Sequence, residues 1–320
     1  MQIYNKISAM TSEEAMVQGG LDWTVETGDV WTTIGDEVIE LPKYKSIIRS
    51  DTRDVLSVMS DKYTPLQNKD KFKWADQLVA QGGAVFEQVG YFGRGEVNWL
   101  LAKLPDGLDF GNSEDVLDKY LMFADSYDGT LAFITKFTTI RPVCRNTFHA
   151  AIKQVQRGTH RVKHTPNMLG RISDVRESLG LVDAYYTMLG EKLKRLADKE
   201  LEDYEVFAFF QQSLEMKEYA STRSANIHGK LMDLYQGDAL GSDVAGKTAW
   251  GALNALTEYT DHHASFKGND ESNRTKSAWL GQGEKLKQRG FDILMASVDN
   301  MYELVPAKVK VGKEQILMEA

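Results

Sequence analysis

Hydrophobic and polar residues alternate over short distances in the first 140 residues, a pattern that predicts strands. The segments KYKSIIRSDT (43–52) and DVLSVMSDKYTPLQ (54–67) contain short apolar runs bounded by turn formers, which is typical of edge or hairpin strands. AVFEQVGYFGRGEVNWLLAKLPDG (84–107) has two such runs around Gly93-Arg94-Gly95, and residues 117–143 repeat the design around Asp128-Gly129. We therefore expect two antiparallel hairpins with flanking strands.

One helix interrupts these strands. NKDKFKWADQLVAQGG (68–83) has apolar residues at helical spacing and ends in two glycines, with Asn68 as the expected cap. An antiparallel sheet with helices on one face follows from this order of elements.

The pattern changes to helical spacing beyond Pro142. Helices are predicted in TFHAAIKQVQ (147–156), in residues 174–216 with breaks at Gly190 and in the acidic cluster at 198–203, in KTAWGALNALTEYTDHH (247–263) and in residues 277–304. Between the last two, SFKGNDESNR (265–274) is expected to be an exposed loop. The tail contains VKVKV, which predicts either an added strand or a frayed end.

These elements predict an α+β protein. Residues 1–172 form an antiparallel sheet of hairpins packed by helices and include a basic stretch, residues 173–304 are helical, and residues 305–320 form a tail.

Composition limits where the chain works. A single cysteine, Cys144, excludes an internal disulfide and a multi-cysteine zinc site, which fits a reducing compartment. The sequence has neither a signal-peptide leader nor an apolar block that could span a membrane. We expect a cytoplasmic protein with no membrane partner.

The charge of the chain is unevenly distributed. The chain has 46 acidic residues against 38 Lys and Arg, yet residues 129–173 contain eight cations and no acid. Without those eight the chain has 30 basic residues and a net charge of −16. The segregated positive charge indicates an anionic partner for residues 129–173, hereafter the basic run.

Helical spacing would gather these cations on one face. Arg145, His149, Lys153 and Arg157 recur every four residues, a stripe about 18 Å long opposite Phe148. Phosphate is the expected ligand, and the following residues are the candidate nucleic-acid contacts: Lys136, Arg141, Arg145, His149, Lys153, Arg157, Arg161 and Lys163, with Tyr91 and Trp99 as rings on which bases stack. The alternative is that the cations line a solvated surface or pair with acidic side chains of the C-terminal half.

Other candidate chemistry is weaker. Cys144 lies in a cationic setting that lowers a thiol pKa, but a lone cysteine is more often a small buried hydrophobe. Asn254, Glu258 and His262 are spaced to share a helix face and a metal, although a second Glu/His pair is missing. No phosphate-binding loop of the NTPase type occurs, so no nucleotide cofactor or motor activity is expected.

Three segments carry a resemblance to a known family. VCRNTF (143–148), TAWGALNALTEYTDH (248–262) and SAWLGQGEKLKQRGFDIL (277–294) are similar to the signature blocks of the phage/plasmid-like proteins with the domain of unknown function 932. The resemblance covers about residues 43–294 and implies a phage, plasmid or prophage protein in a bacterial cytoplasm, without implying an activity. The order of elements also resembles Rad52-like single-strand annealing proteins, which form rings; this likeness concerns architecture alone.

We therefore expect an ATP-independent protein that binds single-stranded DNA, as a homo-oligomer, and promotes strand annealing or protection in replication or recombination. An enzyme is less expected, and no cofactor is. The alternatives are a counter-defence or regulatory protein that binds a small anion such as a nucleotide in the same basic pocket, and a metal-dependent hydrolase using Glu258, Asp261 and His262.

Overall fold

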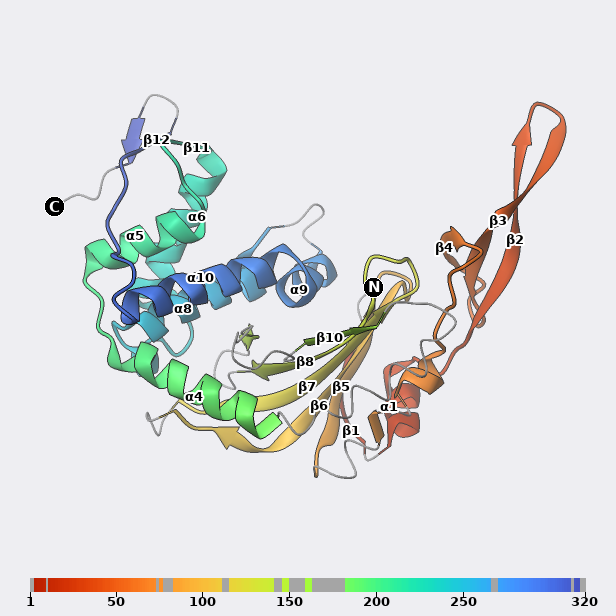
Figure 1. Ribbon diagram of the computed structural model, residues 1–320, viewed down its shortest axis with the longest axis horizontal. Helices are drawn as coiled ribbons and strands as arrows, with labels where there is room; N and C mark the ends of the chain where they lie inside the picture. The colour runs from red at the N-terminus through yellow and green to blue at the C-terminus, as the bar shows by residue number, and fades with distance from the viewer. Residues whose placement is uncertain are drawn as a thin grey trace. The chain divides into compact units, whose positions relative to one another are not determined.

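The computed structural model describes residues 3–9, 11–72, 75–76, 83–110, 115–140, 146–149, 159–162, 182–265, 270–311 and 314–316. The chain forms two compact units that interleave along the sequence (Figure 1). Unit 1 comprises residues 1–106, 119–137 and 153–185, and unit 2 comprises residues 107–118, 138–152 and 186–320. The α+β class is confirmed, with antiparallel sheets in the N-terminal half and helices in the C-terminal half.

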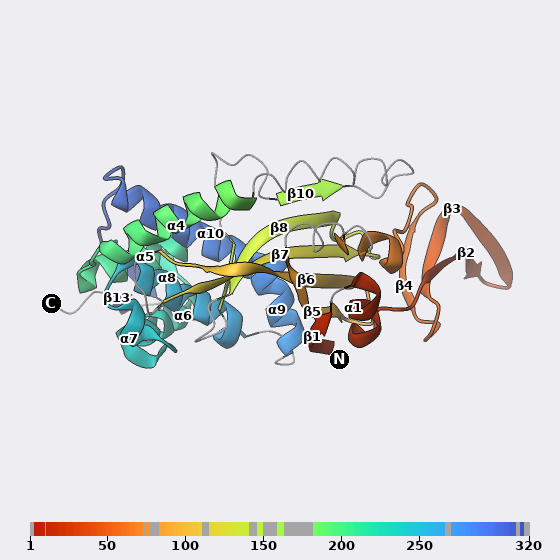
Figure 2. The ribbon, with the colours of Figure 1, turned by 90° about the horizontal axis from the view of Figure 1, so that it is seen from below.

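The largest sheet has seven strands. In order they are β1 (Ile3–Ala9), β5 (Val85–Phe92), β6 (Val97–Leu108), β7 (Leu117–Ser126), β8 (Phe133–Ile140) and β10 (Thr159–Val162), with β9 (Thr147–Phe148) also paired to β8. Figure 2 shows β5 to β8 side by side. All eight residues of β8 are buried.

Both predicted hairpins of this sheet are confirmed. β5 and β6 pair antiparallel around a turn in which Gly93 and Gly95 have φ of 68° and 124°, values that glycine adopts without steric cost. Gly129, between β7 and β8, has φ of 73°. The turn chemistry read from the sequence therefore fixes these connections.

A second, three-stranded sheet lies in unit 1. It consists of β2 (Val25–Ile34), β3 (Glu37–Arg49) and β4 (Val55–Ser60), all antiparallel. The sequence predicted β3 and β4 but gave no sign of β2 or of the helix α1 (Ser12–Gly19). The predicted helix after β4 is helical at residues 68–72 and 75–76. Asn68 is buried and bonds Leu21, Trp23 and Tyr127, so it braces the N-terminal segment and does not serve as the expected cap.

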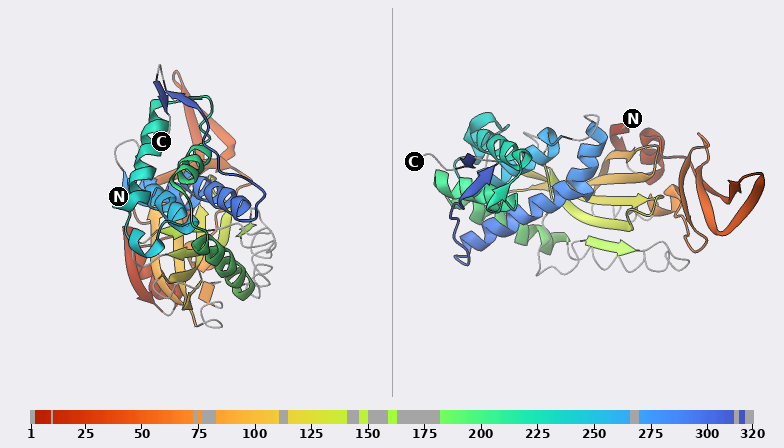
Figure 3. Two further views of the ribbon diagram at one scale, coloured as in Figure 1. Left: turned by 90° about the vertical axis from the view of Figure 1, so that its left-hand side faces the viewer. Right: turned by 90° about the horizontal axis from the view of Figure 1, so that it is seen from above.

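The helices of unit 2 pack around aromatic and aliphatic side chains. They are α4 (Val182–Asp198), α5 (Asp203–Ser213), α6 (Thr222–Asp233), α7 (Ser242–Ala245), α8 (Ala249–Glu258), α9 (Glu271–Leu280) and α10 (Gln282–Val298), with π-helical turns η2 (Leu234–Asp238) and η3 (Tyr259–His263) (Figure 3). Phe209 of α5, Leu256 of α8 and Leu294 of α10 are completely buried. The predicted break at 198–203 is confirmed.

Several predicted helix boundaries are wrong. The helix predicted over residues 277–304 is divided into the end of α9 at Leu280 and the whole of α10, which ends at Val298. Gly190 lies inside α4, where a Cβ would come within 3.1 Å of Leu108; it is a close-packing position and not a break. The expected loop at 265–274 already becomes helical at Glu271, because the Asp270 side chain accepts from the backbone N–H of Ser272 and starts α9.

The tail supplies a strand, the first of the two expected outcomes. β12 (Val309–Val311) pairs parallel with β11 (Tyr219–Ala220) and antiparallel with β13 (Glu314–Ile316). Among the described helices, none is long and apolar enough to cross a bilayer.

Candidate nucleic-acid interface

Two short strands from the basic run pair with β8. Phe148 and Thr147 of β9 oppose Thr139 and Ile140 at the end of β8. In β10, Arg161 opposes Ile134 near the start of β8. Both described parts of the run beyond β8 are therefore held by backbone hydrogen bonds to the same strand.

The predicted phosphate contacts fall into three groups. Arg161 is exposed on β10, His149 is half-buried, and Lys136 is only 4 % exposed. The prediction that Lys136 is open to a phosphate is therefore wrong, because every residue of β8 is buried. The remaining predicted contacts lie outside the described residues, as does Cys144: Arg141, Arg145, Lys153, Arg157 and Lys163.

The predicted helix over 147–156 does not begin where expected. Thr147 and Phe148 form β9, and the polar groups of Thr147 are taken up by residues far away in sequence. The Thr147 N–H donates to Asp261 Oδ2 at 2.9 Å, and its carbonyl accepts from Lys287 Nζ at 2.7 Å. These tertiary bonds compete with a local helical turn and prevail at this position. Residues 150–156 lie outside the described chain.

The two predicted stacking rings have different surroundings. Trp99 is completely buried in β6, so it presents no exposed ring face to a base. Tyr91 is half-buried, and its ring already faces the guanidinium of Arg49, whose Cζ lies 5.0 Å from the ring centroid. The face of the Tyr91 ring that meets Arg49 is therefore already occupied.

Thr147, Asp261 and Lys287 form a buried polar cluster in unit 2, hereafter the lock. Lys287 Nζ lies 2.8 Å from each carboxylate oxygen of Asp261 and 3.0 Å from Thr147 Oγ1, which in turn lies 3.0 Å from Asp261 Oδ1. The Lys287 and Asp261 side chains are 3 % and 6 % exposed. Burial lowers the pKa of Lys287, and the charge of Asp261 opposes that effect.

The lock joins all three segments that carry the family resemblance. Thr147 belongs to VCRNTF, Asp261 to TAWGALNALTEYTDH and Lys287 to SAWLGQGEKLKQRGFDIL. Each segment alone shows only helical or mixed spacing, so the sequence gives no sign of the pairing. The lock fixes β9 to α10 and η3.

Two polar side chains next to the lock in sequence are buried without a full set of partners. Asn146 is 4 % exposed, and among the described residues neither its amide nitrogen nor its oxygen has a hydrogen-bond partner. Glu258 is also 4 % exposed, and its Oε2 has no hydrogen-bond partner in the same part of the chain. A buried polar group without a hydrogen bond typically lowers the free energy of unfolding by about 1–3 kcal/mol, so neither side chain is explained by a stabilising role.

The predicted metal row is not assembled. Asn254 Nδ2 donates to the Trp250 carbonyl, and α8 is a packed core helix as expected. The π-helical turn η3 starts at Tyr259, which shifts the spacing after Glu258: its carboxylate lies 3.7 Å from Nε2 of His263, at i+5, and not at His262. Asp261 is engaged by Lys287. Among the described residues, no three His, Cys, Asp or Glu side chains lie close enough together to hold a metal ion.

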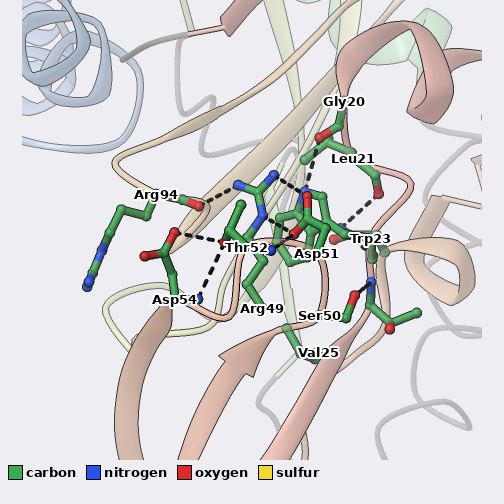
Figure 4. Close-up of polar contacts among 12 residues, drawn as sticks. Gly20, Leu21, Trp23, Val25, Arg49, Ser50, Asp51, Thr52, Asp54 and Arg94 are labelled. Atoms are coloured by element: carbon green, nitrogen blue, oxygen red, sulfur yellow. Dashed lines mark hydrogen bonds and ion pairs between the residues drawn. The ribbon is translucent and has the colours of Figure 1, made fainter.

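Unit 1 contains a polar cluster around Arg49 that the sequence analysis did not predict. Arg49, at the end of β3, donates to both carboxylate oxygens of Asp51 at 2.7 and 2.9 Å and to the Arg94 carbonyl at 2.6 Å (Figure 4). Its guanidinium also lies 4.5 Å from the ring centroid of Trp23. The hydrogen bond from Arg49 lowers the pKa of Asp51. The cluster is fully engaged and fixes the base of β3 to the turn between β5 and β6.

Comparison with known proteins places the chain in one family. The family model of the domain of unknown function 932 matches residues 55–279. No curated protein matches the chain, and neither does any solved structure. Because the match spans more than half of the sequence and includes Asp261 of the lock, the chain belongs to the family of the domain of unknown function 932.

Proposed function

We propose that the chain binds single-stranded nucleic acid, with DNA as the expected form, through the basic run. In this proposal it is a phage, plasmid or prophage protein of the bacterial cytoplasm that anneals or protects strands without ATP. The observation that carries the proposal is the segregation of eight cations and no acid into residues 129–173 of a chain with net charge −8. Such a run attracts a polyanion even when the whole protein is acidic.

The surroundings of the run support this function. β9 and β10 are both paired to β8, and the lock attaches β9 to the helices of unit 2. A cationic segment with fixed attachments loses less conformational freedom on binding than a free tail does. Arg161, exposed on β10, is the described cation best placed to meet a phosphate.

Fluorescence anisotropy with a labelled oligonucleotide tests the proposal. Affinity should fall linearly on a logarithmic salt scale, with a slope of about −0.7 for each single-strand phosphate neutralised. Replacing Arg157, Arg161 and Lys163 by Glu should abolish most binding at low salt. In a matched control variant, Lys62, Lys69 and Lys285, which are exposed outside the run, are also replaced by Glu. This variant should bind the oligonucleotide nearly as tightly as the wild type does.

Oligonucleotide length distinguishes this function from capture of a small anion. A strand-binding run gains affinity from a mononucleotide to a strand of about 20 nucleotides, since more phosphates are contacted. Equal affinity for both, or a flat salt dependence, would contradict the proposal. Annealing of two complementary labelled strands, followed without ATP, then separates annealing from protection.

A further inference from the structure

The distal part of the hairpin formed by β2 and β3 is exposed on both faces. We define residues 26–42 as the arm, and Figure 1 shows it as a two-stranded ribbon that continues past β4. Three of its large apolar side chains lie in solvent: Trp31 is 56 % exposed, Ile34 67 % and Val38 63 %. An isolated two-stranded ribbon is marginally stable in water, and apolar side chains exposed together on one are typical of an interaction surface.

The outer edge of β2 is open to pairing. Within the described structure β2 pairs only with β3. β2 contains neither Pro nor Lys, the residues that commonly protect an edge strand, whereas the distal part of β3 contains Pro42. An extended peptide can therefore add to β2 as a further strand, held by hydrogen bonds between the two backbones.

The base of the arm is held firmly. Arg49 is clamped between Asp51, the Arg94 carbonyl and the Trp23 ring (Figure 4). On the other strand, the Gln67 amide bonds both the N–H and the carbonyl of Val25, each at 3.0 Å. The arm is thus anchored to the rest of unit 1, which reduces the entropic cost of docking.

Two of the three exposed apolar side chains have an acid directly opposite on the neighbouring strand. Trp31 pairs with Glu40, and Ile34 pairs with Glu37. Residues opposite each other in an antiparallel pair point to the same face, with Cα atoms about 4.5–5.5 Å apart. An apolar surface beside a carboxylate matches a Lys or Arg side chain, whose aliphatic stem packs on the apolar group while its charged end pairs with the acid. The Trp31 ring adds attraction for a cation over its face.

The net charge of the arm points to the same kind of partner. The arm contains no Lys, Arg or His, and it contains five acids, all exposed: Glu26, Asp29, Asp36, Glu37 and Glu40. Of these only Glu26 forms an ion pair, with Arg53, in the part of the chain that the structure describes. A second arm placed alongside would bring five more acids and be repelled, whereas a cationic segment would be attracted.

We propose that the arm binds a basic strand of another protein, an extended segment in which Lys or Arg alternates with apolar residues. The segment pairs with the outer edge of β2, and its cationic side chains lie on the pairs Trp31–Glu40 and Ile34–Glu37. This contact uses no residue of the basic run, so it is independent of the proposed function and is tested without nucleic acid.

Fluorescence anisotropy with a labelled peptide of about eight residues, in which Lys and Val alternate, tests the proposal. The wild type should bind this peptide and should not bind the corresponding peptide of Glu and Val, because the arm repels anions. A peptide of Lys and Val with one central Pro should bind at least about tenfold more weakly, since Pro removes a ladder hydrogen bond. No binding of the first peptide, or equal binding of the peptide with Pro, would overturn strand addition to β2.

Charge-reversed variants locate the peptide on the protein. Replacing Glu37 and Glu40 by Lys should weaken binding of the Lys-Val peptide at least about tenfold. In the matched control variant, Asp233 and Glu303, two acids exposed outside the arm, are replaced by Lys. The control has the same net charge as the arm variant and should bind the peptide nearly as tightly as the wild type does. An equal loss in both variants would show only general attraction to an acidic protein and would refute the arm as the site.

A third variant separates docking from loss of folding. Trp31→Thr keeps strand propensity at an exposed position, so the melting temperature should be unchanged, while peptide binding should weaken at least about threefold. Undiminished binding would contradict the contact with the ring. Light scattering without peptide tests a second copy as the occupant of the arm: a wild-type dimer that Trp31→Thr abolishes would exclude the basic strand as its partner.

Discussion

Lys287 and Asp261 hold opposite charges in a site from which water is nearly excluded. Their side chains are 3 % and 6 % exposed, and both also bond Thr147. Removing two charges from water costs several kcal/mol for each ion, and the mutual attraction and the Thr147 bonds offset that cost. The pair is therefore a strong constraint on geometry, since either partner alone would be a buried, uncompensated charge.

We predict that Lys287→Met destabilises the protein by about 3–5 kcal/mol, because Asp261 is then left charged and buried. Urea unfolding followed by circular dichroism measures the change. The double variant Lys287→Met, Asp261→Leu should lose less than the sum of the two single changes. Lys285→Met, exposed on the same helix, should stay within about 0.5 kcal/mol of the wild type; an equal loss in both lysine variants would contradict the lock.

His228 predicts a pH dependence. Its ring is 3 % exposed, and Nε2 lies 3.0 Å from the Phe207 carbonyl, to which the neutral ring donates. Burial lowers the pKa of His228 below its usual value. At a pH between the lowered pKa of His228 in the folded protein and its pKa of about 6.5 in the unfolded chain, the unfolded chain binds the proton more readily. The contribution of the neutral, buried ring to stability is therefore fully present above about pH 6.5 and declines as the pH falls below that value.

The melting temperature should therefore fall from about pH 7.5 to about pH 5.5 more steeply in the wild type than in His228→Gln, in which an amide can still donate to Phe207. Carboxylates that titrate at lower pH are common to both proteins and cancel in the comparison. Identical pH profiles would show that His228 is not the group responsible.

At the scale of elements, close helix packing in unit 2 depends on glycine. A Cβ on Gly290 of α10 would lie 2.4 Å from Leu256 Cδ2 of α8 and 3.3 Å from the Phe209 ring of α5. Gly229, in the middle of α6, has nothing within 4 Å of such an atom. The two glycines thus offer a matched pair of helix positions.

We expect Gly290→Ala to destabilise the protein by about 1–3 kcal/mol through overpacking. Gly229→Ala should stabilise it by about 0.5–1 kcal/mol, because alanine loses less backbone entropy in a helix. Chemical denaturation of both variants measures the difference. The same sign in both would argue against the packing of α10 on α5 and α8.

Elements with strong local signals were predictable. The two hairpins of the large sheet follow from glycines in turns, and apolar spacing predicted helical structure where α4, α5, α8 and α10 lie. The same spacing did not predict α6 or the break between α9 and α10. β2 was missed because Gly28 and Asp29, two residue types that are depleted in strands, interrupt its apolar pattern. β9 was missed because its backbone is satisfied by Asp261 and Lys287, which lie more than 100 residues away.

The candidate site was predictable in charge but not in geometry. The acid-free composition of the basic run is visible in the sequence, whereas its attachment to β8 and to the lock depends on tertiary pairing. Lys136 and Trp99 illustrate the limit. Both were predicted to contact a ligand, but residues 97–102 of β6 and the whole of β8 are buried on both faces, which periodicity along one strand does not reveal.

At the scale of the whole molecule, the chain separates its charges. The basic run holds eight cations and no acid, and the remainder of the chain has a net charge of −16. In the proposed function, a strand that binds the run is repelled by the acidic remainder of the same molecule, over distances that salt screens.

This repulsion gives the last prediction. Replacing Asp233, Asp243 and Glu303, three acids that are exposed outside the run, by Lys should modestly strengthen oligonucleotide binding at low salt, because the repulsion of the strand is reduced. The gain should shrink as salt is raised from about 50 mM to about 500 mM, since salt screens charges that lie far from the strand. Fluorescence anisotropy at the two salt concentrations measures the gain. An affinity at low salt equal to that of the wild type would contradict a repulsive effect of these acids.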